Sequence, residues 1–171
     1  QLTNAAVAIA LAETLRERGF SITRAAIIEG LETATHPGRL EFWPGTPALL
    51  FDGAHNPAGA EALRAYLDEF VHAPITLVFG AMNDKELDKI IAALCPAAAH
   101  VVLTQPTNPR AATLDTLKRI AAPHTKAHTL ELVTSPAEAM QRAAAVTPPD
   151  GLICVTGSLY LVGEVQALLQ R

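Results

Sequence analysis

The sequence has 171 residues, of which 50% are hydrophobic and 18% are charged, and its formal net charge is -4. This length and apolar content suit a compact α/β domain with a sizeable core and exclude a disordered tail. The acidic balance argues against a nucleic-acid binder, and no apolar run approaches the roughly 20 residues that a membrane-spanning helix needs.

The first part of the chain has the pattern of two helices. One is predicted over residues 3–18, with Gly19 as its C-cap, and a second over residues 23–31, with Thr23 as its N-cap. The first helix carries an apolar stripe with a spacing of four residues, made by Val7, Leu11 and Leu15. The chain begins without methionine and already inside this pattern, so we expect it to be a fragment of a longer protein.

A break at residues 35–39, which include Pro37 and Gly38, ends this helical region. We therefore expect two domains, residues 1–38 and residues 39–171. In the second, strand candidates are residues 39–43 (a hairpin arm), 48–51, 75–79, 101–104, 130–133 and 152–155, and helix candidates are residues 58–70, 85–94, 114–122, 136–145 and 159–169. Apolar strands that alternate with helices are typical of a mainly parallel sheet flanked by helices, so we predict a Rossmann-like α/β fold.

A polar loop follows each of four predicted strands. These loops are residues 52–57, 80–85, 104–110 and 156–158. In a parallel sheet the carboxyl ends of the strands meet at one edge, where ligands bind. We therefore expect the four loops to converge on one ligand site.

Asp52 ends a predicted strand, where its carboxylate can accept hydrogen bonds from ribose hydroxyls, help to hold a metal, or accept backbone N–H groups in an Asx turn. The residue alone favours the turn. His55 can bind a carboxylate or phosphate, act as a general acid or base, or bond the loop backbone. Asn56 and Pro57 are the residue types expected at the N-cap and first position of a helix. The hydroxyls of Thr156 and Ser158, at the end of a predicted strand and the start of a helix, can hold an anion or cap the helix.

Three basic residues complete the set of candidates. Lys85 is predicted to open a helix, where a bound phosphate would explain a positive charge; a solvated ion pair with Glu86 or Asp88 is the alternative. Arg39 and Arg110 lie beside loops rich in proline or glycine. Their guanidinium groups suit a carboxylate or a nucleotide, or a surface ion pair.

Several common motifs are absent. The sequence contains no G-x-x-x-x-G-K-[ST] phosphate-binding loop and no G-x-G-x-x-G dinucleotide fingerprint. No CxxC, HExxH or His/Cys cluster predicts a metal site. Cys95 and Cys154 lie far apart in apolar segments, so we expect buried free thiols in a reducing compartment, and hence a cytoplasmic protein.

The string F-D-G-A-H-N-P at residues 51–57 and the string T-G-S-L-Y-L-V-G-E-V at residues 156–165 resemble the folylpolyglutamate synthase/dihydrofolate synthase family of the Mur ligase superfamily. Weaker matches follow the family's order over essentially the whole chain. They are Q-L-T-N-A-A at residues 1–6, H-P-G-R-L-E at residues 36–41, D-K-E at residues 84–86 and P-R-A at residues 109–111.

The resemblance implies the C-terminal domain of an ATP- and Mg²⁺-dependent ligase, preceded by the last two helices of its central ATPase domain. Such a ligase adds L-glutamate to dihydropteroate or tetrahydrofolate through an acyl phosphate. By this resemblance Asn4 and Arg39 contact the adenine nucleotide and Asp52 its ribose. The resemblance also implies that His55 and Ser158 lie toward the glutamate, that Lys85 approaches the phosphates and that Arg110 binds a carboxylate. His55 and Lys85 are the expected catalytic residues, and the metal ligands are expected outside this chain. Without a P-loop, the fragment alone is expected to be inactive.

Two other functions stay open at this point. One is the C-terminal domain of a Mur ligase that extends a peptidoglycan precursor. The other is a noncatalytic Rossmann-like module that binds a nucleotide or an amino acid, which an upstream P-loop would exclude. A hydride-transferring enzyme is disfavoured because the glycine fingerprint is missing after every candidate strand. The sequence indicates no oligomeric state.

Overall fold

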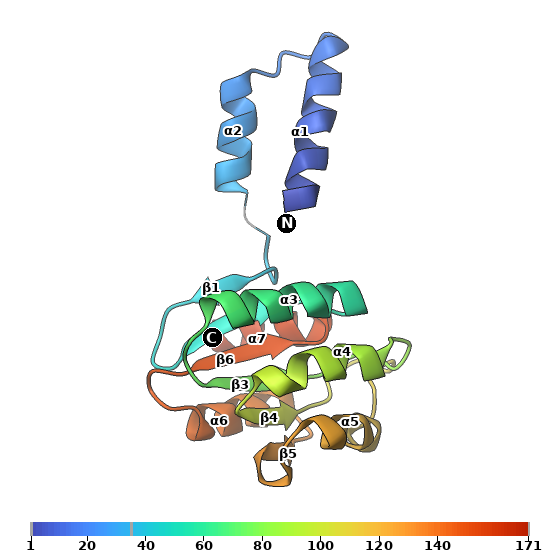
Figure 1. Cartoon of the computed structure of the whole chain (residues 1–171), viewed down its shortest axis with the longest axis vertical. Coiled ribbons are helices and arrows are strands. Elements are labelled where there is room, and N and C mark those ends of the chain that lie inside the picture. Colours follow the sequence, from blue (N-terminus) through green and yellow to red (C-terminus); the bar gives the residue numbers. More distant parts are fainter. Residues whose placement is uncertain (1, 35, 171) are drawn as a thin grey trace. The chain divides into compact units, whose positions relative to one another are not determined.

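The computed structural model describes residues 2–34 and 36–170. The chain divides into two compact units, residues 1–36 and residues 37–171, which appear in Figure 1 as a helical part and a sheet-containing part. The division falls inside the break predicted from the sequence. Gln1, the first residue of the Q-L-T-N-A-A string, and Thr35, the first residue of the predicted break, lie outside the described residues.

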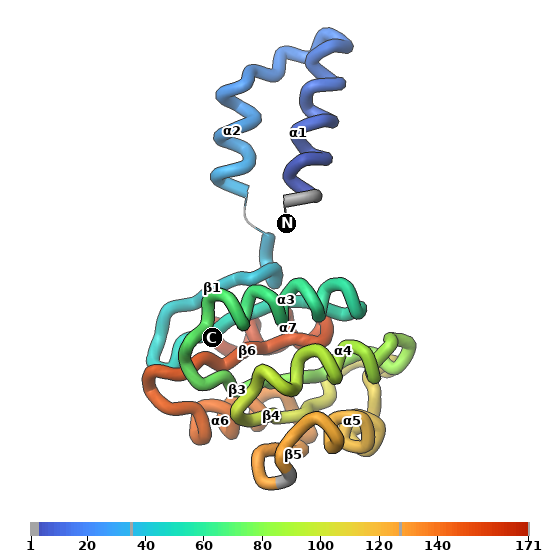
Figure 2. Tube along the Cα trace, in the orientation of Figure 1, coloured from blue at the N-terminus to red at the C-terminus, as the bar shows by residue number. Residues whose placement is uncertain are grey.

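Two helices form the first unit: α1 spans Leu2–Glu17 and α2 spans Arg24–Thr33. They lie side by side (Figures 1 and 2). Thr23 caps α2 as predicted, because its hydroxyl oxygen accepts a hydrogen bond from Ala26 N at 3.1 Å. The apolar stripe on α1 remains 40% exposed at Leu15 and 60% exposed at Leu11, and α2 buries none of its residues. This unit therefore has no core of its own among the described residues.

The second unit contains one sheet with the strand order β1-β2-β6-β3-β4-β5. All neighbouring pairs are parallel except β1 and β2, which form the predicted antiparallel hairpin. The strands are β1 (Glu41–Trp43), β2 (Ala48–Asp52), β3 (Ile75–Phe79), β4 (His100–Leu103), β5 (Leu130–Leu132) and β6 (Leu152–Thr156). The helices are α3 (Pro57–Phe70), α4 (Leu87–Leu94), α5 (Leu114–Ala121), α6 (Pro136–Val146) and α7 (Leu159–Leu169), with short 3₁₀ helices at Cys95–Ala97, Ala122–His124 and Ala127–Thr129. The predicted α/β fold is confirmed.

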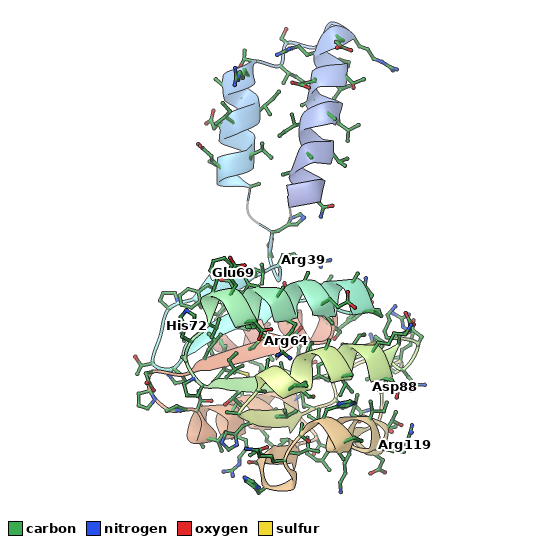
Figure 3. The ribbon with its side chains drawn as sticks, viewed as in Figure 1. Arg39, Arg64, Glu69, His72, Asp88 and Arg119 are labelled. Atoms are coloured by element: carbon green, nitrogen blue, oxygen red, sulfur yellow. The ribbon has the colours of Figure 1, made fainter. Side chains whose placement is uncertain are left out.

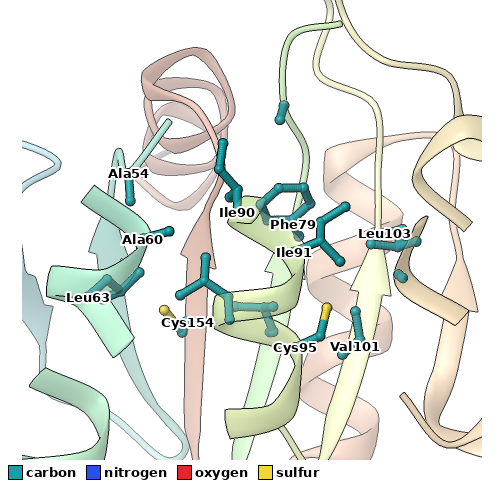
Figure 4. Packing of buried hydrophobic residues seen from close by; sticks show 14 of the residues in the cluster. Ala54, Ala60, Leu63, Phe79, Ile90, Ile91, Cys95, Val101, Leu103 and Cys154 are labelled. Atoms are coloured by element: carbon teal, nitrogen blue, oxygen red, sulfur yellow. The ribbon is translucent and has the colours of Figure 1, made fainter. Parts of the chain in front are cut away.

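Helices cover both faces of this sheet. Successive residues of a strand point to opposite faces, so Leu77 packs beneath α3, α4 and α5 while Val78 packs beneath α6 and α7. The buried apolar residues on these two faces form two core clusters. The cluster on the α3, α4 and α5 face is the larger, and Figure 4 shows Phe79 and Ile90 within it. Because β3 is buried along its whole length, the sheet is a rigid support for the loops at its edge.

One helix boundary differs from the prediction. The helix predicted over residues 85–94 begins at Leu87, with Glu86 as its N-cap, so Lys85 precedes the helix instead of opening it. The acidic and amide residues from Asn83 to Glu86 favour a turn over a helical start. None of the described helices is both long and apolar enough to cross a membrane.

Both cysteines are buried and free, as predicted. Burial raises the pKa of the Cys95 thiol to about 12, and burial together with the nearby negative charge of Asp52 raises the pKa of the Cys154 thiol further. Since the thiolate is the reactive form, neither thiol is expected to react while the chain is folded.

We expect the folded chain to resist a disulfide-exchange reagent at pH 8, with labelling of Cys95 and Cys154 limited by unfolding. The measurement is the absorbance of the released thiolate, with and without denaturing urea. Both thiols should react within minutes in urea. Rapid stoichiometric labelling of either cysteine in buffer would contradict the buried positions.

Candidate ligand site at the carboxyl edge of the sheet

The four predicted loops begin side by side. Asp52 at the end of β2 pairs with Thr156 at the end of β6, and Thr156 pairs in turn with Phe79 at the end of β3. Phe79 pairs with Leu103 on β4, the residue before the fourth loop. The predicted convergence of the loops at one edge of the sheet is therefore confirmed.

Asp52 is buried and its carboxylate joins two segments of the chain. Its Oδ1 accepts a hydrogen bond from Ala54 N at 2.8 Å, and its Oδ2 accepts one from Leu40 N at 2.9 Å. Burial raises the pKa of Asp52, an effect opposed by these two N–H donors and by the positive charge of Arg39. The first bond is the Asx turn that the residue type favoured, and each carboxylate oxygen keeps a lone pair for another donor.

His55 has one ring nitrogen fixed by the same loop. Its Nδ1 lies 2.7 Å from the carbonyl oxygen of Gly53, and because a carbonyl only accepts, Nδ1 carries the proton in this contact. The other nitrogen, Nε2, is thereby left for a ligand. Asn56 caps α3 as predicted, since its Oδ1 accepts a hydrogen bond from Gly59 N at 2.8 Å and Pro57 begins the helix.

Glycines let the loops approach one another closely. A Cβ on Gly157, whose φ is +103°, would lie 2.7 Å from the carbonyl oxygen of Gly80, and a Cβ on Gly80 would lie 2.6 Å from that of Thr104. A Cβ on Gly53 would lie 2.3 Å from Leu159 Cδ2. The sequence placed these glycines in the loops but did not predict that they set the spacing between loops.

Ser158 and Thr156 have different roles at the end of β6. The Ser158 hydroxyl oxygen accepts a hydrogen bond from Leu161 N at 3.1 Å, so it caps α7. The Thr156 hydroxyl is buried and has no hydrogen-bond partner, and the same is true of Thr104 at the start of the fourth loop. The sequence had offered the Thr156 hydroxyl, like that of Ser158, for an anion. In the structure this hydroxyl, in register with Asp52, is a buried polar group without a partner, which is costly to the folded chain.

Lys85 and Arg110 lie on either side of Asp84. Lys85 Nζ is 3.3 Å and Arg110 Nη1 is 3.9 Å from Asp84 Oδ2. The side-chain hydrogen bond from Lys85, and to a lesser extent the positive charges of Lys85 and Arg110, lower the pKa of Asp84. The alternative ion pair with Glu86 or Asp88 is not the one found, because Lys85 pairs with Asp84 and precedes the helix that carries Asp88. The structure brings the two cations together from separate loops.

The other two candidates belong to the turn before β1 and to α1. Arg39 is exposed in the turn before β1, and its charge acts on Asp52. Figure 3 labels it at the beginning of the second unit. Asn4 is an exposed residue of α1, in the first unit. Within the described residues, no group of three or more carboxylate, histidine or cysteine side chains is arranged to hold a metal ion.

A family model described as "Mur ligase, glutamate ligase domain" matches residues 38–159. The chain belongs to this family. The match runs from the turn before β1 to the first residue of α7, and so includes all four loops at the carboxyl edge.

Known proteins resemble the glutamate ligase domain and its preceding helices over most of the chain. A probable bifunctional folylpolyglutamate synthase/dihydropteroate synthase of Haloferax volcanii is 34% identical over 171 residues, which are 100% of this chain and 20% of the relative. The structure of Escherichia coli FolC in complex with DHPP and ADP is 27% identical with a TM-score of 0.86, over 98% of this chain and 38% of that one.

A bifunctional folylpolyglutamate synthase/dihydrofolate synthase with Mn, AMPPNP and L-glutamate bound is 25% identical, with a TM-score of 0.80. That likeness covers 92% of this chain and 37% of the other. The chain thus spans between a fifth and two fifths of the length of these proteins.

We expect Thr156→Val to stabilise the chain by about 1 kcal/mol, because it removes a buried hydroxyl that has no partner while keeping the side-chain shape. Thr76→Val is the matched control. The Thr76 hydroxyl is also buried on the sheet but lies 2.7 Å from the Thr147 hydroxyl, so this change should destabilise the chain by a similar amount.

Urea unfolding followed by circular dichroism measures both free energies of unfolding. Destabilisation by Thr156→Val equal to that by Thr76→Val would contradict the unpartnered state of the Thr156 hydroxyl.

Proposed function

We propose that the chain is the C-terminal part of an ATP-dependent ligase that adds L-glutamate to dihydropteroate, tetrahydrofolate or both. The observation that carries this proposal is the junction of β2, β6 and β3 in a glutamate ligase domain, where the ends of the strands bring the loops of Asp52, His55 and Ser158 together. The names of the similar proteins support the choice of folate over a peptidoglycan precursor, and they favour an enzyme over a binding module.

The chemistry requires activation of a carboxylate. The pterin carboxylate attacks the γ-phosphorus of ATP, forming an acyl phosphate and ADP. The amine of glutamate then attacks the acyl carbon, the bond from that carbon to the phosphate oxygen breaks, and phosphate and the amine proton are released. A divalent cation would neutralise charge on the phosphates, but Asp52 is already engaged by two N–H donors, so this chain's described residues do not fit a metal site.

Each candidate residue receives a role that its geometry permits. His55 uses Nε2 to contact the glutamate and to take the amine proton, since Nδ1 is held by Gly53 O. Ser158 lies toward the same glutamate. Lys85 and Arg110, which share Asp84 as an ion-pair partner, contact phosphate and carboxylate groups.

The nucleotide assignments complete the proposal. Asn4 and Arg39 contact the adenine nucleotide, and Asp52 accepts a hydrogen bond from its ribose with a remaining lone pair. Asn4 belongs to the first unit and Arg39 to the second. His55 and Lys85 are the proposed catalytic residues.

The first unit, residues 1–38 in this proposal, belongs to the central ATP-binding domain, and residues 39–171 form the glutamate ligase domain. The exposed apolar residues of α1 and α2 support this division, because such a stripe normally packs against a larger core. The ATP-binding domain would also supply the P-loop and the metal ligands, so the fragment alone would be inactive. Free buried thiols are consistent with a cytoplasmic enzyme.

This division predicts how the two units respond to truncation. Removal of residues 1–36 should leave the free energy of unfolding of the remaining chain unchanged within about 0.5 kcal/mol, because the second unit has its own two core clusters. Urea unfolding of residues 37–171 beside the whole chain measures this. A loss of more than about 2 kcal/mol would show that the first unit is part of the same folded body.

The test of function uses the intact gene product that carries this chain. With ATP and Mg²⁺, ADP release should require both L-glutamate and dihydropteroate or tetrahydrofolate. His55→Ala should lower kcat by about 100-fold, since it removes the proposed proton acceptor. His72→Ala is the matched control, because His72 is an exposed histidine before β3, at the amino end of the sheet (Figure 3).

Release of ADP without any need for glutamate would contradict the proposed reaction. Equal kcat values for the two histidine variants would contradict the proposed role of His55. Release that depends on a peptidoglycan precursor would replace folate as the acceptor.

A further inference from the structure

The turn that carries Arg39 is held by hydrogen bonds at its first residue, Gly38. Gly38 N donates a hydrogen bond to Glu41 Oε2 at 2.7 Å, and Gly38 O accepts one from Gly53 N at 2.7 Å. Gly38 is buried, its φ is +68°, and a Cβ there would lie 3.1 Å from Val162 Cγ1. The N–H and carbonyl groups of Gly38 are therefore both hydrogen-bonded, and a side chain at this position would be crowded.

The same turn is also held by a hydrogen bond at its last residue, Leu40. Leu40 has a φ of +45°, a left-handed conformation that residues with a side chain rarely adopt. Leu40 N donates its hydrogen bond to Asp52 Oδ2 at 2.9 Å. A strained backbone persists only where its surroundings impose it, so the turn needs the two carboxylates that hold it.

Glu41 links this turn to two other elements. Its Oε2 accepts a hydrogen bond from Gln166 Nε2 of α7 at 2.9 Å in addition to that from Gly38 N, and its Oε1 accepts one from Trp43 Nε1 at 2.9 Å. These donors, Gly38 first, lower the pKa of Glu41. The carboxylate thus uses both oxygens to join the turn, β1 and α7, and is left ionised at neutral pH.

We propose that Glu41 is a positioning residue for nucleotide binding, which holds the Gly38–Leu40 turn so that Arg39 is presented to the nucleotide. The inference rests on the proposed function, because it concerns the residue assigned to the adenine nucleotide. In this proposal Glu41 acts on the turn and not on the nucleotide. Its contribution is preorganisation: a turn that is already in its bound conformation loses less conformational entropy when the ligand arrives.

The first test concerns the turn alone and needs no ligand. In the 171-residue chain, Glu41→Ala should speed hydrogen exchange of the Gly38 amide by about tenfold or more, since a bond to a charged acceptor is lost. Glu41→Gln should restore much of the protection, because its amide oxygen can still accept from Gly38. Glu69→Gln, a change at an exposed carboxylate of α3 (Figure 3), is the matched control and should leave the exchange unchanged.

Trp43 gives a second readout in the same samples. It is the only tryptophan in the sequence, so its indole Nε1–H produces one resonance, which should shift in Glu41→Ala and not in Glu69→Gln. Unchanged Gly38 exchange together with an unchanged Trp43 resonance in Glu41→Ala would overturn the inference whatever the ligand is.

The second test separates positioning from a merely structural role. In the intact ligase, Glu41→Ala should raise KM for ATP by about tenfold with a smaller change in kcat, and Glu41→Gln should recover most of the loss. The double variant with Arg39→Ala should be no worse than Arg39→Ala alone, because Glu41 acts through Arg39. Additive losses would overturn the inference. If Arg39→Ala left KM and kcat unchanged, the assignment of Arg39 to the nucleotide would be contradicted instead. The hydrogen-exchange experiment would still test whether Glu41 holds the turn.

Discussion

The buried carboxylate of Asp52 is the contact on which the site's geometry depends. It lies at the last residue of β2 and accepts N–H groups from the loop that follows β2 and from the turn that precedes β1. The two donors, Leu40 N and Ala54 N, belong to residues outside the strands of the sheet. A buried charge is tolerated only when such donors surround it, and here the same donors place Arg39 and His55 around one point.

The remaining loops are placed by close backbone packing. β6 lies between β2 and β3, so the segment after β6 reaches the loops on both sides. Gly157 and Gly80 keep those segments at distances that a side chain would not permit. On the far side, Glu164 of α7 accepts hydrogen bonds from Thr107 N at 2.9 Å and from Thr107 Oγ1 at 2.8 Å, which holds the loop that carries Arg110. The candidate site is therefore built from several elements of the second unit.

Local sequence patterns predicted most of the fold. β3 and α7 match their predicted ranges, and the caps at Thr23 and Asn56 follow from residue types alone. The position of β6 inside the sheet was not predicted, because the pairing of residues about a hundred positions apart leaves no local trace. For the same reason the role of Glu41, which depends on Gln166, was missed. The prediction that Lys85 opens a helix was wrong because α4 begins two residues later, at Leu87.

The central claim is that the Asp52 carboxylate organises the ligand site, and Asp52→Asn tests it most directly. The change keeps the size of the side chain but replaces one oxygen with an NH₂ group, so either Ala54 N or Leu40 N loses its acceptor. The account predicts a loss of about 2 kcal/mol in the free energy of unfolding, measured by urea denaturation of this chain. An unchanged free energy of unfolding would contradict it.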